Sequence, residues 1–166
     1  MTSHEAFVAI NPATGLTEGH YPVLDVDEID ASVGGCHRAQ KAWEIVGFEQ
    51  RAELLQQLGG QLEDQREHLA RLITGEMGKP LSQAEIEIDK CAWVCRYFAE
   101  SGEAFLRTDE IQLGGLVASV VPRPLGVILA IMPWNFPFWQ VFRALAPALM
   151  VGNGMLHQRR FQCSWM

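Results

Sequence analysis

The apolar residues in the first two thirds of the chain recur at the three- and four-residue steps that are typical of amphipathic helices. Asp25 predicts the N-cap of a first helix, with Glu28 at the capping-box position. The apolar stripe of this helix consists of Val26, Ile29, Val33, Cys36 and Trp43. A second helix is predicted from about Phe48 to Glu76, and Gly78 is placed to end it. Its stripe consists of Leu55, Leu58, Leu62, Leu69 and Leu72.

The third predicted helix follows Pro80, and its apolar steps alternate between three and four residues throughout. These apolar residues are Leu81, Ala84, Ile88, Cys91, Cys95, Phe98, Gly102 and Phe105. A seam of this kind is typical of a helix that packs along a neighbouring helix. We therefore expect the first 107 residues to be mainly helical.

After Arg107 the pattern changes to that of strands. The apolar segments 111–113 and 116–121 flank Gly114-Gly115 and predict a two-stranded hairpin. The unbroken apolar run 126–132 predicts a strand covered on both faces, as in a parallel sheet. A helix is predicted from Pro137 to about Met150, with a kink at Pro147. These elements indicate an α/β fold that is incomplete, because a parallel strand needs neighbours and covering helices.

Charge narrows the choice of partners. The chain has 13 Lys and Arg against 20 Asp and Glu, a net charge of −7, which argues against nucleic-acid binding. Residues 124–142 carry no charge and could resemble a membrane span. Pro133 and Pro137 lie inside this stretch and would break a spanning helix, so we expect a buried strand, turn and helix and no membrane contact.

The cysteines bear on the cellular compartment and on whether the chain has a metal or redox site. The start of the chain lacks the pattern of a secretory signal, which favours free thiols in the cytoplasm. Cys91 and Cys95 have a spacing that would suit a metal pair or redox thiols. No second pair with zinc spacing accompanies them, and both lie on the apolar seam, as Cys36 lies on the first stripe. We therefore expect buried core cysteines and no metal site.

The turn from Pro133 to Pro137 contains a polar side chain that could take part in catalysis. Ligands bind at the carboxyl ends of strands in α/β sheets, and Asn135 lies at such an end. Its amide could donate to a developing oxyanion, or it could merely cap the next helix. Arg143, the one charged residue between 136 and 155, either extends to solvent or binds a carboxylate. No G-x-G-x-x-G motif follows the strand.

Four motifs, in this order and spacing, resemble the aldehyde dehydrogenase superfamily. They are Ile10-Asn11-Pro12-Ala13-Thr14-Gly15, Glu76-Met77-Gly78-Lys79-Pro80, Pro124-Leu125-Gly126-Val127-Ile128 and Pro133-Trp134-Asn135-Phe136-Pro137. The run from Ile131 to Val141 is similar to the bacterial succinate-semialdehyde dehydrogenase branch in particular. The resemblance covers about residues 7–156.

The resemblance implies an enzyme that oxidises a small aldehyde to the acid with NAD or NADP bound on a Rossmann-like domain. In such enzymes a cysteine attacks the aldehyde and a glutamate activates water. Asn135 matches the oxyanion asparagine, and Arg143 matches an arginine that faces the carboxylate of succinate semialdehyde. The segment that matches the nicotinamide side of the cofactor site is Ile131, Met132, Pro133 and Trp134. The hairpin matches an arm through which subunits form homo-oligomers.

The resemblance also implies four regions: a helical part of the cofactor domain at 1–107, the oligomerisation arm at 108–123, the start of the Rossmann-like unit at 124–156, and a tail at 157–166. Family chains are much longer, and their catalytic cysteine and glutamate lie downstream of the stretch matched here. None of the four cysteines of this chain lies in the family's nucleophile motif. We therefore expect this chain alone to be inactive.

The tail departs from the family pattern, which would place a cofactor-ribose lysine at Gln158. Possible codons for residues 161–166, read one base later, allow a family-like sequence, so we interpret residues 157–166 as read in a shifted frame. The alternative function is a catalytically dead interaction module that associates with full-length subunits.

Overall fold

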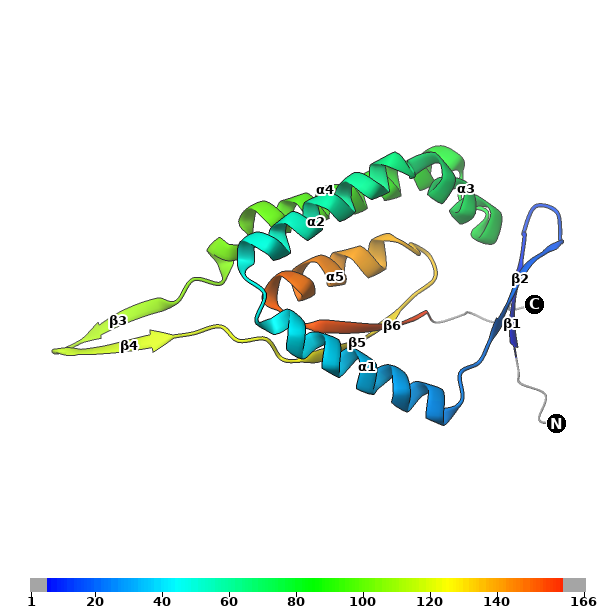
Figure 1. The fold of residues 1–166 in the computed structure, drawn as a ribbon. Coiled ribbons are helices and arrows are strands. Elements are labelled where there is room, and N and C mark those ends of the chain that lie inside the picture. Colours follow the sequence, from blue (N-terminus) through cyan, green and yellow to red (C-terminus); the bar gives the residue numbers. More distant parts are fainter. Residues whose placement is uncertain (1–5, 160–166) are drawn as a thin grey trace.

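A computed structural model describes residues 6–159 of the chain. The elements in chain order are β1 (Ala6–Ile10), β2 (Thr17–Pro22), α1 (Val26–Glu44), α2 (Phe48–Asp64), α3 (Arg66–Met77), α4 (Leu81–Phe105), β3 (Asp109–Leu113), β4 (Leu116–Val120), β5 (Val127–Met132), α5 (Trp139–Val151) and β6 (Gly154–Arg159). Helices α2 and α4 lie side by side on one face of α5, β5 and β6 lie beyond α5, and α1 lies on the other side of that strand pair (Figure 1). The mixed helix and strand architecture confirms the expected α/β class.

Helix α1 begins where the sequence predicts. The Glu28 N–H donates to Asp25 Oδ1 at 2.8 Å, and the Asp25 N–H donates to Glu28 Oε2 at 2.9 Å. The complete capping box satisfies two backbone donors at once and confirms the predicted start. The stripe of α1 is exposed over its first half, where Val26, Ile29 and Val33 face solvent.

The single helix predicted from Phe48 to Glu76 is wrong. The structure breaks it at Gln65, which ends α2 and precedes α3 with φ −100° and ψ 11°. The break shifts the buried face by one position, because Ala70 and Ile73 are buried while Leu72 is 47% exposed. No glycine or proline marks the break, so the leucine spacing carried no sign of it.

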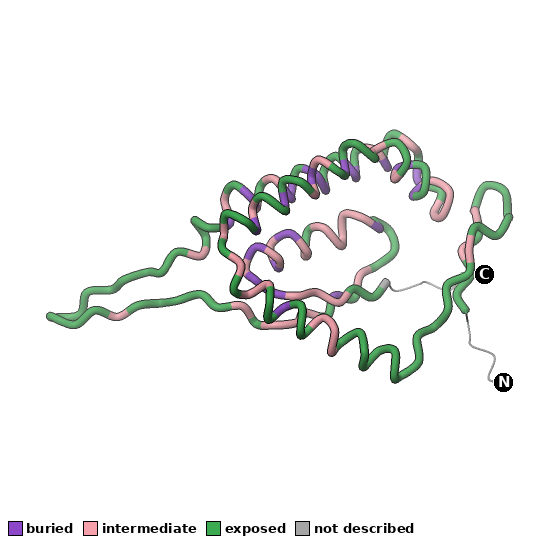
Figure 2. Tube along the Cα trace, in the orientation of Figure 1, coloured by how far each residue is buried: buried purple, intermediate pink, exposed green. Residues whose placement is uncertain are grey.

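Helix α4 provides most of the core, as its apolar seam predicts. Fully buried residues of the seam are Ala84, Ile88, Cys91 and Cys95. At Gly102 the helix meets α5 so closely that an added Cβ would overlap Met150 Cγ. The buried residues concentrate where α2, α3, α4 and α5 face one another (Figure 2). The core is therefore a helical one, with α5 packed into it.

The predicted hairpin is present as β3 and β4. Gly114 and Gly115 have φ of 54° and 97°, the left-handed values that a tight two-residue hairpin turn requires. The two strands pair antiparallel and project from the body of the molecule (Figure 1). Almost all of their residues are exposed (Figure 2).

Strands β5 and β6 form a parallel pair in which Val127 lies opposite Gly154 and Met132 opposite Arg159. The pairing confirms the parallel sheet predicted from the apolar run. The expectation that the strand is covered on both faces is wrong, because Leu129 and Ile131 are 61% and 59% exposed. The Gly126 N–H donates to Asn153 Oδ1 at 3.0 Å and joins the starts of the two strands. Strand β6 continues through Arg159, so the boundary predicted between 156 and 157 falls inside a strand. Residues 160–166 of the predicted tail lie outside the described residues.

Two further features were not predicted as they are observed. An N-terminal antiparallel pair, β1 and β2, encloses the Asn11–Gly15 motif, where Asn11 Oδ1 accepts from the N–H groups of Ala13 and Thr14. Helix α5 begins at Trp139, not at Pro137, and ends at Gly152 with φ 97°. Among residues 6–159, none of the helices combines the length and the apolar character that crossing a bilayer would require.

Candidate active site at the carboxyl end of β5

Asn135 lies in the turn between the carboxyl end of β5 and the start of α5. Its side chain is exposed and makes no hydrogen bond with the described part of the chain. Phe138 is the N-cap of α5, and no side chain of the turn caps the helix. The capping role weighed for Asn135 is therefore wrong, and its amide is not bound by any residue among 6–159.

A glutamate that sequence reasoning missed holds the start of α5. Glu87 Oε1 accepts from the N–H groups of Phe138 at 2.9 Å and of Trp139 at 3.0 Å. These two donors have no partner within the helix, and a carboxylate also suits the positive end of the helix dipole. Glu87 therefore caps α5 from a different helix, 51 residues away in sequence.

The other oxygen of Glu87 is paired with Lys79. Lys79 Nζ donates to Glu87 Oε2, and the two side chains are only 8% and 1% exposed. Lys79 Nζ also lies 3.8 Å from the centre of the Phe136 ring, inside the turn itself. A signal for this pair was present in the sequence, because Glu87 is a charge embedded beside Ile88 in the apolar seam.

The opposite end of α5 is also fixed by side chains. Trp43 Nε1 donates to the Leu149 carbonyl at 2.8 Å, Arg51 Nη1 to the Met150 carbonyl at 2.8 Å, and Gln40 Nε2 to the Gly152 carbonyl at 3.1 Å. These bonds give side-chain donors to carbonyls at the end of α5, where the Leu149 carbonyl also accepts from the Gly152 N–H. The start of α5 is thus anchored to α4, and its end to α1 and α2.

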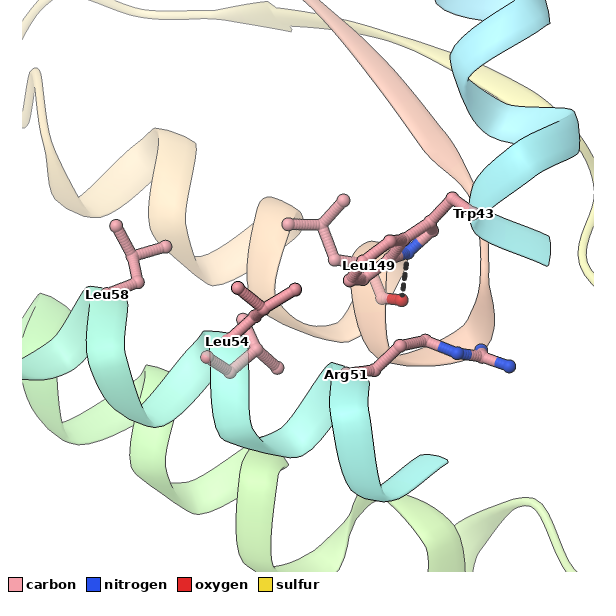
Figure 3. Close-up of a pocket in the computed structure, with 6 residues that line it drawn as sticks. Trp43, Arg51, Leu54, Leu58 and Leu149 are labelled. Carbon is pink, nitrogen blue, oxygen red and sulfur yellow. Dashed lines mark hydrogen bonds between the residues drawn. The ribbon is translucent and has the colours of Figure 1, made fainter. Parts of the chain in front are cut away.

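A pocket of about 230 Å³ lies near these anchors (Figure 3). Its lining residues are Trp43, Arg51, Leu54, Leu55, Leu58 and Leu149. The pocket lies at the carboxyl end of α5, away from Asn135, and the polar groups of Trp43 and Arg51 bind backbone carbonyls. It is lined mainly by leucine side chains and is not the candidate active site.

The remaining residues suggested by the resemblance lie around the same turn. Ile131 is 59% exposed and Trp134 is 44% exposed, Pro133 is exposed and Met132 is half-buried. Arg143 lies on α5, is exposed, and forms no ion pair with the described residues. In β6, Gln158 lies opposite Ile131, so the position where the resemblance expects a lysine is beside the segment that the resemblance assigns to the cofactor.

The buried cysteines are unsuited to nucleophilic attack. Burial raises the pKa of the Cys95 thiol to about 11. Burial, followed by the nearby negative charge of Glu87, raises the pKa of Cys91 well above its usual range. The thiolate is the nucleophile, so both remain inert thiols at neutral pH. Within residues 6–159 the acidic, histidine and cysteine side chains form no cluster suited to a metal ion.

Comparison with known proteins assigns the family. The model of the aldehyde dehydrogenase family matches residues 1–162. The chain belongs to this family. The match runs past residue 156, where the sequence interpretation placed the end of the resemblance, and into the tail.

Several curated relatives are succinate-semialdehyde dehydrogenases. A probable succinate-semialdehyde dehydrogenase (NADP(+)) of Synechocystis sp. is 42% identical over 148 residues, which cover 89% of this chain and 33% of the relative. The succinate semialdehyde dehydrogenase (NAD(P)+) of Escherichia coli is 40% identical over 149 residues, 90% of this chain and 32% of the relative. The chain thus spans about a third of the length of these relatives and matches only their N-terminal part.

Solved structures of the family agree with the fold. The structure of Gox0499 superposes with a TM-score of 0.90 at 30% identity, covering 93% of this chain and 34% of that one. The NADP+ complex of succinic semialdehyde dehydrogenase from Streptococcus pyogenes gives a TM-score of 0.88 at 29% identity, with 93% and 34% covered. The α/β architecture is therefore that of an incomplete aldehyde dehydrogenase.

Proposed function

We propose that this chain supplies the N-terminal part of an NAD(P)-dependent dehydrogenase that oxidises succinate semialdehyde, or a similar small aldehyde, to the acid. The family membership and the two succinate-semialdehyde dehydrogenases at 40% and 42% identity support this choice of substrate. We place the protein in the cytoplasm, consistent with its free thiols at Cys36, Cys91 and Cys95.

The position of Asn135 carries the proposal. It is exposed at the carboxyl end of a parallel strand, its side chain is not used for capping, and the turn that holds it is anchored to α4. A pre-positioned amide donor at such a place can stabilise negative charge that develops on a carbonyl oxygen. In the complete enzyme Asn135 would serve this role beside a nucleophile that lies outside the matched third.

The residues of the strand end fit a nicotinamide cofactor. Ile131 and Trp134 expose apolar side chains next to the turn, where a flat ring could pack against them, with Met132 and Pro133 beside them. When bound, NAD or NADP accepts a hydride from the substrate. Side chains of this segment would exclude water from one face of the ring and orient it toward Asn135.

Arg143 would set the preference for an acidic aldehyde. Its guanidinium is exposed on the helix that leaves the turn and is not paired with any described carboxylate, so it can bind the carboxylate of succinate semialdehyde. The exposed hairpin of β3 and β4 would join subunits into a homo-oligomer, as the resemblance implies.

We further propose that this chain has no dehydrogenase activity by itself. Cys91 and Cys95 are buried with raised pKa values, and Cys36 lies on α1, behind β6 and against Gly154. Purified chain with succinate semialdehyde and NADP should give no increase in reduced-cofactor absorbance. Sustained turnover would contradict this proposal.

A chimaeric enzyme tests the function directly. Residues 1–156 of this chain replace the corresponding third of the Synechocystis relative, which is 42% identical over the matched region. The chimaera should oxidise succinate semialdehyde with NADP. Asn135→Asp, which keeps the shape but removes both donors, should lower kcat by about 100- to 1000-fold with little change in the KM for cofactor. An active chimaera in which Asn135→Asp leaves kcat unchanged would refute the role of Asn135.

The alternative is an inactive module that associates with full-length subunits. The projecting hairpin, with exposed Ile111, Leu113, Leu116 and Val117, favours it, because an exposed apolar strand pair is suited to association. Co-elution with a full-length family member on size exclusion would support the module. Inclusion bodies would favour an incomplete folding unit.

The frame of the tail stays a proposal of its own. Sequencing the gene downstream of codon 156 tests it: a family-like continuation in a shifted frame supports the interpretation, and its absence in both other frames contradicts it.

A further inference from the structure

We propose that Glu87, held by Lys79, is the positioning residue for the Asn135 turn. The inference rests on the proposed function for its catalytic meaning, but its physical content concerns only contacts within this chain. Three features converge on the turn: the carboxylate of Glu87, the ammonium of Lys79, and the ring of Phe136.

The first step is the anchor on the helix. The N–H groups of Phe138 and Trp139 point away from α5 and have no acceptor within the helix, so Glu87 Oε1 is what satisfies them. Glu87 is on α4, whose surrounding residues Ala84, Ile88 and Cys91 are completely buried. The start of α5 is thus fixed to a fully buried part of the core.

The second step is the charge of the anchor. A carboxylate with 1% exposure is stable only if it is paired, and Lys79 Nζ supplies the pairing at Oε2. Lys79 follows Gly78, whose φ of 73° ends α3, so the end of one helix places the ammonium beside the next. The ion pair compensates the buried charge at Oε2, while Oε1 accepts from α5.

The third step links the anchor to Asn135. The ring of Phe136, the residue after Asn135, lies 3.8 Å from Lys79 Nζ. Two residues further on, the N–H of Phe138 donates to Glu87. Asn135 therefore lies between β5, which ends at Met132, and the start of α5, where the Phe136 carbonyl accepts from the Gln140 N–H and Glu87 holds the backbone of Phe138 and Trp139. Only residues 133–135 separate these two anchored segments, and an amide donor that must meet a developing charge requires fixed geometry.

Two double variants of the 166-residue chain separate the effect of the hydrogen bonds between Glu87 and α5 from the effect of the ion pair with Lys79. Lys79→Met with Glu87→Gln removes both charges but keeps an acceptor at Oε1. Lys79→Met with Glu87→Leu removes both charges and the acceptor. Neither leaves an unpaired buried charge, so the pair isolates the two hydrogen bonds to α5.

The first measurement is backbone amide exchange. Phe138 and Trp139 should be protected in the parent chain and in the Gln variant, and should exchange about tenfold faster in the Leu variant. The exchange rates of the α4 amides around Ile88 should be the same in both variants. Three results would each contradict the claim that Glu87 binds the start of α5. They are fast exchange of the Phe138 and Trp139 amides in the parent chain, equal exchange of these amides in the two variants, and a uniform increase in exchange that includes α4.

The second measurement follows Asn135 itself, through the ¹⁵N relaxation of its backbone and side-chain amides. A purely structural role would change the unfolding midpoint without changing these signals. We expect nanosecond motion at Asn135 to increase in the Leu variant and not in the Gln variant. Unchanged Asn135 dynamics in the Leu variant would overturn the positioning role. Because neither measurement needs turnover, failure of the proposed function would be seen separately, in the chimaera.

Discussion

The buried pair of Lys79 and Glu87 should respond asymmetrically to removal of one partner. Glu87→Gln leaves the ammonium of Lys79, whose side chain is 8% exposed, with the Phe136 ring as its one remaining described partner. Breaking a buried pair in this way costs about 3–5 kcal/mol of unfolding free energy. Lys79→Met instead leaves a carboxylate that still accepts two backbone N–H groups at the N-terminus of α5.

Those remaining bonds should reduce the loss. Hydrogen bonds to charged groups contribute about 1.5–3 kcal/mol each, and the helix dipole adds to them. We therefore expect Lys79→Met to lower the unfolding free energy by about 2 kcal/mol. The double variant Lys79→Met with Glu87→Gln should be more stable than Glu87→Gln alone, because no buried charge is left unpaired.

Urea unfolding at pH 7, followed by tryptophan fluorescence and circular dichroism, measures all four proteins of this cycle. The coupling free energy should be about 2–3 kcal/mol. The exposed pair Arg71 and Glu67, at 2.7 Å on α3, is the matched control and should give a coupling below about 0.5 kcal/mol. Additive losses for Lys79 and Glu87, or equal losses in the two single variants, would refute the reasoning.

The remaining predictions concern the site and the cysteines. In the active chimaera, Arg143→Ala should raise the KM for succinate semialdehyde far more than the KM for an uncharged aldehyde; equal effects would remove Arg143 from the substrate site. In the folded chain, iodoacetamide at pH 8 should leave Cys91 and Cys95 unmodified, as mass spectrometry can check, whereas urea should make both reactive; rapid native labelling would contradict their burial. The raised pKa of Cys95, about 11 in the folded chain against about 8.5 unfolded, means that the unfolded state loses its proton first. Stability from this thiol is therefore complete below about pH 8.5 and declines as the pH rises toward 11, so an unfolding midpoint in urea that increases over that range would be the contrary result.

Several elements could be predicted from the sequence because short-range interactions determine them. In each case residues close in sequence define the element. Examples are the capping box at Asp25 and Glu28, the paired glycines at 114–115 and the apolar run before Pro133. The family motifs indicate the turn around Asn135 as the candidate site. The roles of Asn135 and Arg143 stay predictions until the chimaera is measured.

Long-range contacts decided the rest. The break at Gln65 carries no local signal; in the structure α3 beyond it packs on α4, where Arg66 binds Asp89 at 2.6 Å. The start of α5 at Trp139, two residues later than Pro137 suggests, coincides with the two hydrogen bonds of Glu87.

The sequence by itself determined the buried seam of α4, the tight turns and the family, because these depend on residues within a few positions of one another or on motif order. Only the tertiary structure decided that a glutamate on α4 caps α5 and that Asn135 does not. The physical reason is that a buried carboxylate finds its donors by packing: Glu87 and Phe138 are 51 residues apart, and no local pattern joins them.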